Sequence, residues 1–176
     1  NGSTVGTTTP AGTATTTISG RLTIANAHFL DAGSSVWDLA GTGTVLVSNG
    51  NLLVGTSLFR FSGAGATVPS MTYYNLLLSA GIASPTYTST GSGILVLNNL
   101  TVGGGTNSTF DLNTNDTILE VRGNTNITAS GTIGASNSAL LNLLGSWTNA
   151  GSFIGNSGTT TFAGTGTTNI NAGNSS

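Results

Sequence analysis

The chain has 176 residues, of which 37% are hydrophobic and only 5% are charged, and its formal net charge is −2. A disordered chain normally carries more charge and fewer large apolar residues, so this composition predicts a folded protein. The three basic residues are all arginine and there is no cysteine. We therefore expect no nucleic-acid partner, no attraction to an anionic membrane surface and no disulfide bonds.

Short segments rich in Thr, Val, Leu, Ile and Phe alternate with Gly- and Asn-rich corners along the whole chain. Such segments predict β-strands separated by turns. The leucines at 140–144 could open a helix, but Gly145 follows at once and no capping pattern surrounds them. The predicted strands are 15–19, 22–25, 36–39, 44–47, 58–62, 73–79, 94–97, 100–102, 117–122, 126–129, 140–144, 152–154 and 159–163.

A shift of 101 residues brings a set of positions into register, so that residues 21–68 match 122–169. The shared word is Phe61-Ser-Gly-Ala-Gly-Ala-Thr67 against Phe162-Ala-Gly-Thr-Gly-Thr-Thr168. Periodicity of this kind is typical of arrays in which each unit stacks on its neighbour. We therefore expect residues 1–176 to form a single elongated β-repeat module with an internal repeat of about 101 residues.

Several words of the chain resemble the repeats of adhesin-like β-solenoid proteins, which are very large secreted bacterial surface proteins. The words are Tyr73-Tyr-Asn-Leu-Leu-Leu78, Leu95-Val-Leu-Asn-Asn-Leu-Thr-Val102, Thr109-Phe-Asp-Leu-Asn113, Gly145-Ser-Trp-Thr-Asn-Ala-Gly-Ser-Phe153 and Gly158-Thr-Thr-Thr-Phe-Ala-Gly-Thr-Gly166. The likeness covers residues 70–170 well and 15–70 loosely, and the first half departs from the pattern around Trp37. The resemblance implies parallel β-helix rungs at a cell surface, and it transfers no catalytic residues.

These patterns predict an all-β fold, specifically a parallel β-helix or β-solenoid of about seven to eight rungs; an antiparallel β-sandwich is the alternative. The alternation in residues 22–24 and 59–61 places apolar side chains on one face of a strand. The side chains expected to face inward are Ile18, Leu22, Ile24, Phe29, Val36, Leu39, Val45, Val47, Leu52, Val54, Phe59, Phe61, Leu76, Leu78, Ile94, Val96, Leu100, Val102, Phe110, Leu112, Ile118, Val121, Ile127, Ile133, Leu141, Leu143, Phe153, Phe162 and Ile170.

Few residues suggest chemistry, and each has a structural alternative. His28 is the single histidine and could act with Asp31 in acid–base chemistry, although a loop residue is the simpler interpretation. Asp111 and Asp116, with Glu120 nearby, are weak calcium candidates because hard cations take oxygen ligands. The residues around them lack the glycine turn of a known calcium loop. We therefore expect no catalytic residue, no bound metal and no cofactor.

Two further residue classes could contact sugars. N-glycosylation sequons begin at Asn99, Asn107, Asn115 and Asn126, and such sequons permit glycosylation without showing it. The aromatic residues could line a sugar-binding groove, but aromatic residues on strands more often belong to the core. They are Trp37, Trp147, Tyr73, Tyr74 and Tyr87.

The functional expectation is a non-enzymatic building block of an extracellular filament, stalk or matrix fibre. Open stacks of strands expose unpaired backbone groups at their ends, and such edges invite another chain. Because no capping helix is evident, we expect head-to-tail contact with copies of the chain or with flanking repeats. An adhesin segment that binds glycans or surfaces is the alternative, and a β-helix enzyme is a third, weaker one.

Overall fold

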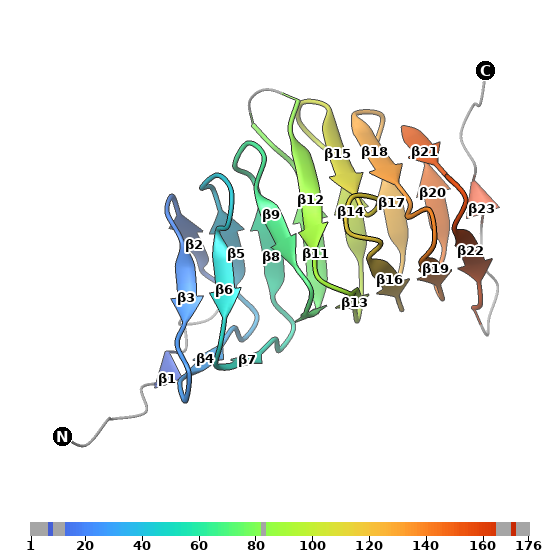
Figure 1. The fold of residues 1–176 in the computed structure, drawn as a ribbon. Coiled ribbons are helices and arrows are strands. Elements are labelled where there is room, and N and C mark those ends of the chain that lie inside the picture. The colour runs from blue at the N-terminus through green and yellow to red at the C-terminus, as the bar shows by residue number, and fades with distance from the viewer. Residues whose placement is uncertain (1–6, 9–12, 82–83, 165–169, 172–176) are drawn as a thin grey trace.

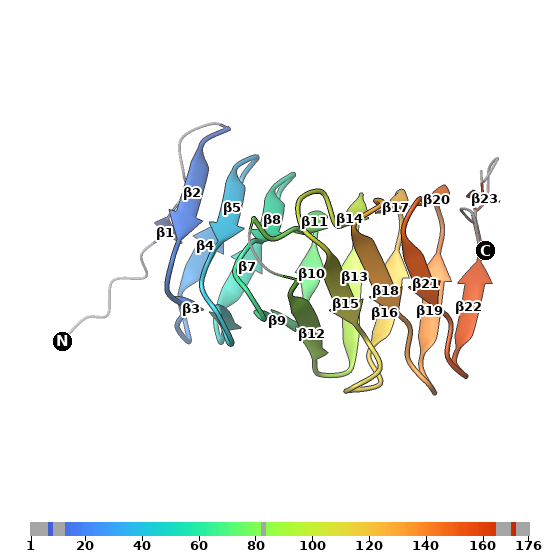
Figure 2. The same ribbon diagram turned by 90° about the horizontal axis from the view of Figure 1, so that it is seen from above.

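The computed structural model describes residues 7–8, 13–81, 84–164 and 170–171, and every regular element in them is a β-strand. The strands are stacked in one row from β2 to β22 (Figures 1 and 2). Every strand pairing is parallel. The predicted β-solenoid is therefore confirmed, and the antiparallel sandwich is wrong. Among the described residues there is no helix that could span a membrane.

The first wall of the solenoid is a sheet of eight strands, one from each turn, which gives about seven turns. The register places Val36 beside Leu58 and Leu100 beside Thr125. This sheet is the one that runs without interruption through the described chain. Its strands are β2 (Thr15–Ile18), β5 (Val36–Leu39), β8 (Leu58–Phe61), β11 (Asn75–Leu78), β14 (Leu100–Val102), β17 (Thr125–Ile127), β20 (Trp147–Asn149) and β23 (Ile170–Asn171).

The second wall contains the strand that follows the first-wall strand in each turn. It consists of a two-stranded and a five-stranded sheet. An isolated parallel bridge between Gly43 and Ala66 links the two parts. The strands are β3 (Leu22–Ile24), β6 (Leu46–Ser48), β9 (Thr67–Pro69), β12 (Thr86–Thr90), β15 (Ser108–Asp111), β18 (Gly131–Gly134) and β21 (Ser152–Ile154).

The third wall completes each turn and is likewise divided, into a three-stranded and a five-stranded sheet. Both divisions fall at the turn that starts at β8, where Leu58 pairs with Asn75 only 17 residues later. The strands are β1 (Thr7–Thr8), β4 (Phe29–Asp31), β7 (Asn51–Leu53), β10 (Thr72–Tyr73), β13 (Gly93–Val96), β16 (Ile118–Val121), β19 (Leu140–Leu143) and β22 (Thr159–Phe162).

The structural repeat is one turn of the coil, and it does not coincide with the predicted 101-residue unit. Phe61 lies on β8 in the first wall, whereas Phe162 lies on β22 in the third wall. The number of residues in a turn varies along the chain. Two residues that are 101 positions apart can therefore lie in different walls. Stacking requires side chains to match between neighbouring turns, and those neighbours are about 17–25 residues apart.

Inward side chains from the three walls form one narrow core. Alternation within strands confirms most predicted inward residues, including Leu39, Phe59, Val102 and Ile133, all of which are buried. The side chain of Ile170 lies outside the described residues. Four predictions are wrong: Phe29 and Ile118 are exposed, and Val36 and Val47 are half-buried, whereas Phe162 is exposed although it occupies an inward position. Beside each of the four, the adjacent residue is buried instead: Leu30, Leu119, Trp37 and Leu46.

Asparagine side chains stack at the corner before the first wall and hold successive turns together. The Oδ1 of Asn75 accepts a hydrogen bond from the Asn99 backbone N–H at 3.3 Å. The Oδ1 of Asn99 accepts from the Asn124 N–H at 3.0 Å, and the Oδ1 of Asn124 accepts from the Ser146 N–H at 3.0 Å. Side-chain amides thus satisfy backbone donors at a corner where the strand ladder is interrupted.

Replacing Asn99 with alanine should lower the free energy of unfolding by about 0.5–1.5 kcal/mol, because the Asn124 N–H loses its acceptor. Urea unfolding followed by circular dichroism measures the loss. Asn99→Asp is the matched control because it keeps an acceptor oxygen in place, and we expect it to lose less. Equal losses in the two variants would contradict the role of the Oδ1 acceptor.

Candidate functional site

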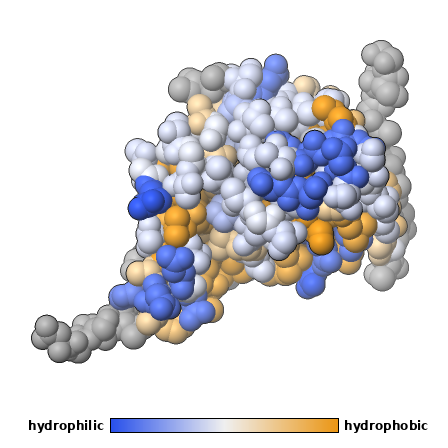
Figure 3. Space-filling model, viewed as in Figure 1, coloured by the Kyte–Doolittle hydropathy of each residue, from blue (hydrophilic) through white to orange (hydrophobic). Residues whose placement is uncertain are grey.

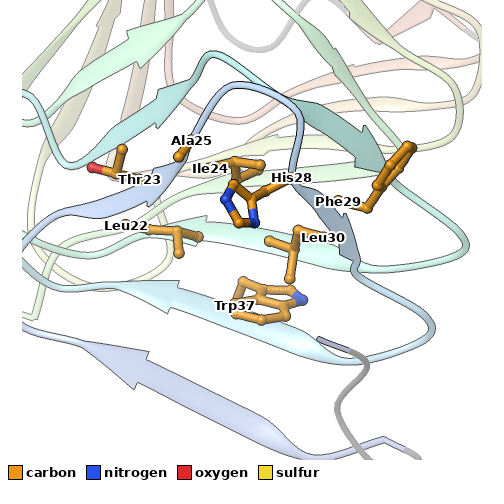
Figure 4. A pocket seen from close by; sticks show the side chains of 8 residues that line it. All are labelled: Leu22, Thr23, Ile24, Ala25, His28, Phe29, Leu30 and Trp37. Carbon is orange, nitrogen blue, oxygen red and sulfur yellow. The ribbon is translucent and has the colours of Figure 1, made fainter. Parts of the chain in front are cut away.

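His28 and Asp31 have separate structural surroundings. The Oδ1 of Asp31 accepts a hydrogen bond from the Gly33 backbone N–H at 3.0 Å and so shapes the turn after β4. His28 lines a cavity among Leu22, Ile24 and other apolar side chains (Figure 4). The structure therefore places Asp31 at the end of β4, where its side chain holds the following turn, and His28 beside hydrophobic groups.

The acidic residues that were weak calcium candidates are engaged in local hydrogen bonds. The Oδ1 of Asp111 accepts from the backbone N–H groups of Asn113 and Thr114. Asp116 accepts from the Ser136 Oγ at 2.7 Å, and Glu120 accepts from the Arg122 Nε at 2.8 Å. In the part of the chain that the structure describes, no group of three or more His, Cys, Asp or Glu side chains could hold a metal ion.

Hydrogen bonds from Ser136 and then Ser138 lower the pKa of Asp116. A lowered pKa in the folded state means that this group stabilises the fold above its unfolded pKa of about 3.9, and that the contribution is lost as the pH falls through the folded pKa. We expect Ser136→Ala to raise the pKa of Asp116 toward its ordinary value in an NMR titration of the carboxyl carbons. The pKa of Glu120, which Arg122 lowers, serves as the internal control and should stay where it is.

The four candidate glycosylation sites differ in their surroundings. Asn107 is exposed in the connection between β14 and β15. Asn126 is half-buried on β17. The Nδ2 of Asn115, the atom that would carry a glycan, donates to the Ser89 carbonyl at 2.7 Å, and Asn99 belongs to the corner ladder. Asn107 and Asn115 are thus the exposed residues of the four, and Asn115 uses its glycan-carrying nitrogen in a hydrogen bond.

The tryptophans and two of the tyrosines are core residues. Trp37, Trp147, Tyr73 and Tyr87 are all buried, and Tyr74 is half-buried. Burial also raises the pKa of Tyr73 well above its ordinary value. The sugar-binding groove considered for these aromatic residues is therefore not formed by them, and the core interpretation is confirmed.

Both tryptophans occupy the same core column of the first wall. A column is the set of positions that pair with one another from strand to strand. In the first wall this column consists, in chain order, of Thr16, Trp37, Phe59, Leu76, Leu100, Thr125, Trp147 and Ile170. Each tryptophan is therefore on the second strand from an end of the sheet. Large aromatic side chains thus close the core near both ends, where fewer neighbouring turns can pack against it.

The N-terminal end of the core contains a cavity of about 310 Å³. Leu22 and Ile24 of the second wall, Leu30 of the third wall and Trp37 of the first wall line it, with His28 beside them (Figure 4). Phe29 also borders this space, and its ring is directed away from Leu30 and Trp37, in keeping with its exposed position in β4 (Figure 4). Trp37 forms the inner end of the cavity and stacks on Phe59 with ring centroids 6.2 Å apart.

The C-terminal end of the core ends in an aromatic layer with one ring from each wall. Trp147 meets Phe153 edge-to-face at 5.1 Å and Phe162 edge-to-face at 5.9 Å. Phe162 pairs with the buried Leu143, so it occupies an inward position of its strand. It is nevertheless 40% exposed. An inward aromatic residue is therefore uncovered because no described strand of the third wall follows β22.

The strands at both ends have one unpaired edge each. Within the described strands, β2 and β3 end their sheets on the N-terminal side, and β21 and β22 end theirs on the C-terminal side. No signal in the sequence marked these edges, because they depend on where each sheet stops.

The class that this fold defines is a parallel β-solenoid. No protein-family model matches the chain, and no curated protein or solved structure matches it either.

Proposed function

We propose that this chain is a structural building block of an extracellular filament, stalk or matrix fibre, in which neighbouring solenoids join head to tail. The observation that supports this most is the set of unpaired parallel edges at the two ends of the described coil. Unpaired N–H and C=O groups are a template for further strands. Both ends belong to the same three walls and have the same strand direction, so a further solenoid can continue the ladder.

The outer surface supports an extracellular location in this proposal. Residues of intermediate hydropathy cover most of the face seen in Figure 3, with strongly hydrophilic patches among them and apolar residues gathered along its lower side. Ladders of Thr and Asn take the place of the charged residues that cover most cytoplasmic proteins. The proposed partners are copies of this chain or flanking repeats of the same polypeptide, and this role needs neither a cofactor nor a catalytic side chain.

Negative-stain microscopy of the purified chain tests the proposal across a series of protein concentrations. We expect uniform filaments whose length increases with concentration, and sedimentation should show the same trend. Particles that remain monomeric at the highest concentration would overturn the head-to-tail proposal.

An adhesin segment is the second candidate, and one hollow on the outer side of the third wall favours it. The missing side chain of Gly93 leaves a depression of about 350 Å³ beside Leu95 and the exposed Ile118. The Glu120–Arg122 ion pair lies at its rim. A hollow with an apolar floor and polar rim can bind a sugar ring. Binding to an immobilised glycan panel, lost in Ile118→Asp, would support this candidate.

A further inference from the structure

We propose that Phe162 of one copy inserts into the N-terminal cavity of a second copy, so that the joint between solenoids is a core contact as well as a strand pairing. This inference rests on the proposed head-to-tail assembly and names the residues that would form its interface. Two complementary features at opposite ends of the coil carry it: an uncovered aromatic residue and an apolar cavity.

The receiving end is a core layer that neighbouring strands cover on two walls only. β1 precedes Leu30 on the third wall and β2 precedes Trp37 on the first wall, whereas no described strand precedes β3 on the second wall. Trp37 is only 4% exposed, and Leu30 and Ile24 are also buried, yet together with Leu22 they surround an open space. Apolar walls of this kind gain free energy when an apolar group replaces water. The side chains come from all three walls, so a group on the axis of the solenoid would contact each of them.

The inserting end presents a side chain in the orientation of a core residue. In earlier turns the same column of the third wall holds Tyr73, Val96, Val121 and Leu143, all buried. Phe162 follows Leu143 in this column. An edge-to-face contact between its ring and the ring of Trp147 holds the side chain in place. Its ring is thus directed along the core and remains uncovered.

A second copy is the occupant that the geometry favours. Copies translated along the axis bring β22 toward β1, the strand that ends the third wall of the next copy beside Leu30. They also bring β21 toward β3, which carries Leu22 and Ile24 of the cavity. The unpaired edges of β21 and β22 then meet strands with the same direction and about the same 4.8 Å spacing. Strand pairing supplies the alignment, and burial of Phe162 excludes water from the joint.

Phe162→Asp tests the contact, with Ile154→Asp as the matched control. Ile154 lies in the same last turn, is 51% exposed and occupies an outward position, since it follows the inward Phe153. A carboxylate in an apolar cavity is costly, so we expect Phe162→Asp to raise the critical concentration for assembly at least about ten-fold. Ile154→Asp should assemble like the unmodified protein. Circular dichroism melting checks that both variants fold.

Cross-linking gives a second readout that does not depend on the aspartate variant folding. Because the chain has no cysteine, Phe162→Cys can be mixed with Ala25→Cys, whose thiol would lie at the cavity. We expect oxidation to link these copies, and to link Ile154→Cys with Ala25→Cys far less. Filaments of Phe162→Asp equal to those of the unmodified protein, or equal cross-linking of the two pairs, would overturn this inference and leave head-to-tail assembly standing. An unmodified protein that never assembles would overturn both.

Discussion

Phe59→Ala should lower the free energy of unfolding by about 3–5 kcal/mol, the largest effect expected from a single core substitution in this chain. Phe59 has no exposed surface. Its ring stacks on Trp37 and meets the edge of Tyr73 at 5.7 Å. Truncation therefore removes the contact with Trp37 of the preceding turn and the contact with Tyr73 of the third wall, and it leaves a cavity that rigid strand ladders cannot close. Urea unfolding followed by tryptophan fluorescence and circular dichroism measures the change.

Leu53→Ala is the matched control for Phe59→Ala. Leu53 is 54% exposed at an outward position of β7. Loss of its side chain creates no cavity, so we expect a change within about 0.5 kcal/mol. Similar losses in the two variants would show that burial in the described core does not determine stability.

Gly63→Ala should destabilise the fold by about 1–3 kcal/mol or more, because an added methyl group would overlap backbone atoms of the preceding turn. A Cβ at this position would lie 1.7 Å from the Gly41 carbonyl oxygen. Gly63 also donates its N–H to the Leu39 carbonyl at 3.3 Å, so the corner cannot move away without loss of that bond. Thermal unfolding followed by circular dichroism measures the effect.

Gly20→Ala provides the control at the outermost position of the same corner. A Cβ at Gly41 would lie 2.6 Å from the Gly20 carbonyl oxygen, which places Gly20, Gly41 and Gly63 in one stack. A Cβ at Gly20 itself meets nothing within 4 Å. We expect Gly20→Ala to be neutral or slightly stabilising, since alanine restricts the unfolded chain. A large loss at Gly20, or none at Gly63, would contradict close stacking as the reason for these glycines.

The sequence predicted which segments form strands better than it predicted which residues of a strand face inward. Phe29-Leu30 and Ile118-Leu119 each offer two adjacent apolar side chains, and alternation alone does not say which one is inside. A shift of one residue reverses the faces of a strand. Pairing with the neighbouring turn settles the choice: Leu119 stacks beside Leu141, and the neighbouring Ile118 faces outward.

The sequence also did not predict where each turn has its corners or which wall each strand belongs to. The short turn between Leu58 and Asn75 divides two of the three walls, and no unusual residue pattern marks it. The 101-residue match between Phe61 and Phe162 is present in the sequence but joins different walls. Turn length is a property of how each loop packs at a corner, and similar words can therefore occupy different places in the coil.

Composition and local alternation predicted an all-β fold, because Thr- and Leu-rich strands with Gly and Asn corners satisfy backbone groups and bury apolar side chains. They favoured a parallel solenoid and left the antiparallel sandwich as the alternative. Inter-turn register decided the rest. It determined that Trp37, rather than Val36, packs in the core, and that a cavity and an uncovered Phe162 lie at opposite ends. These features arise from contacts between residues about 20 positions apart, and local sequence patterns do not encode such contacts.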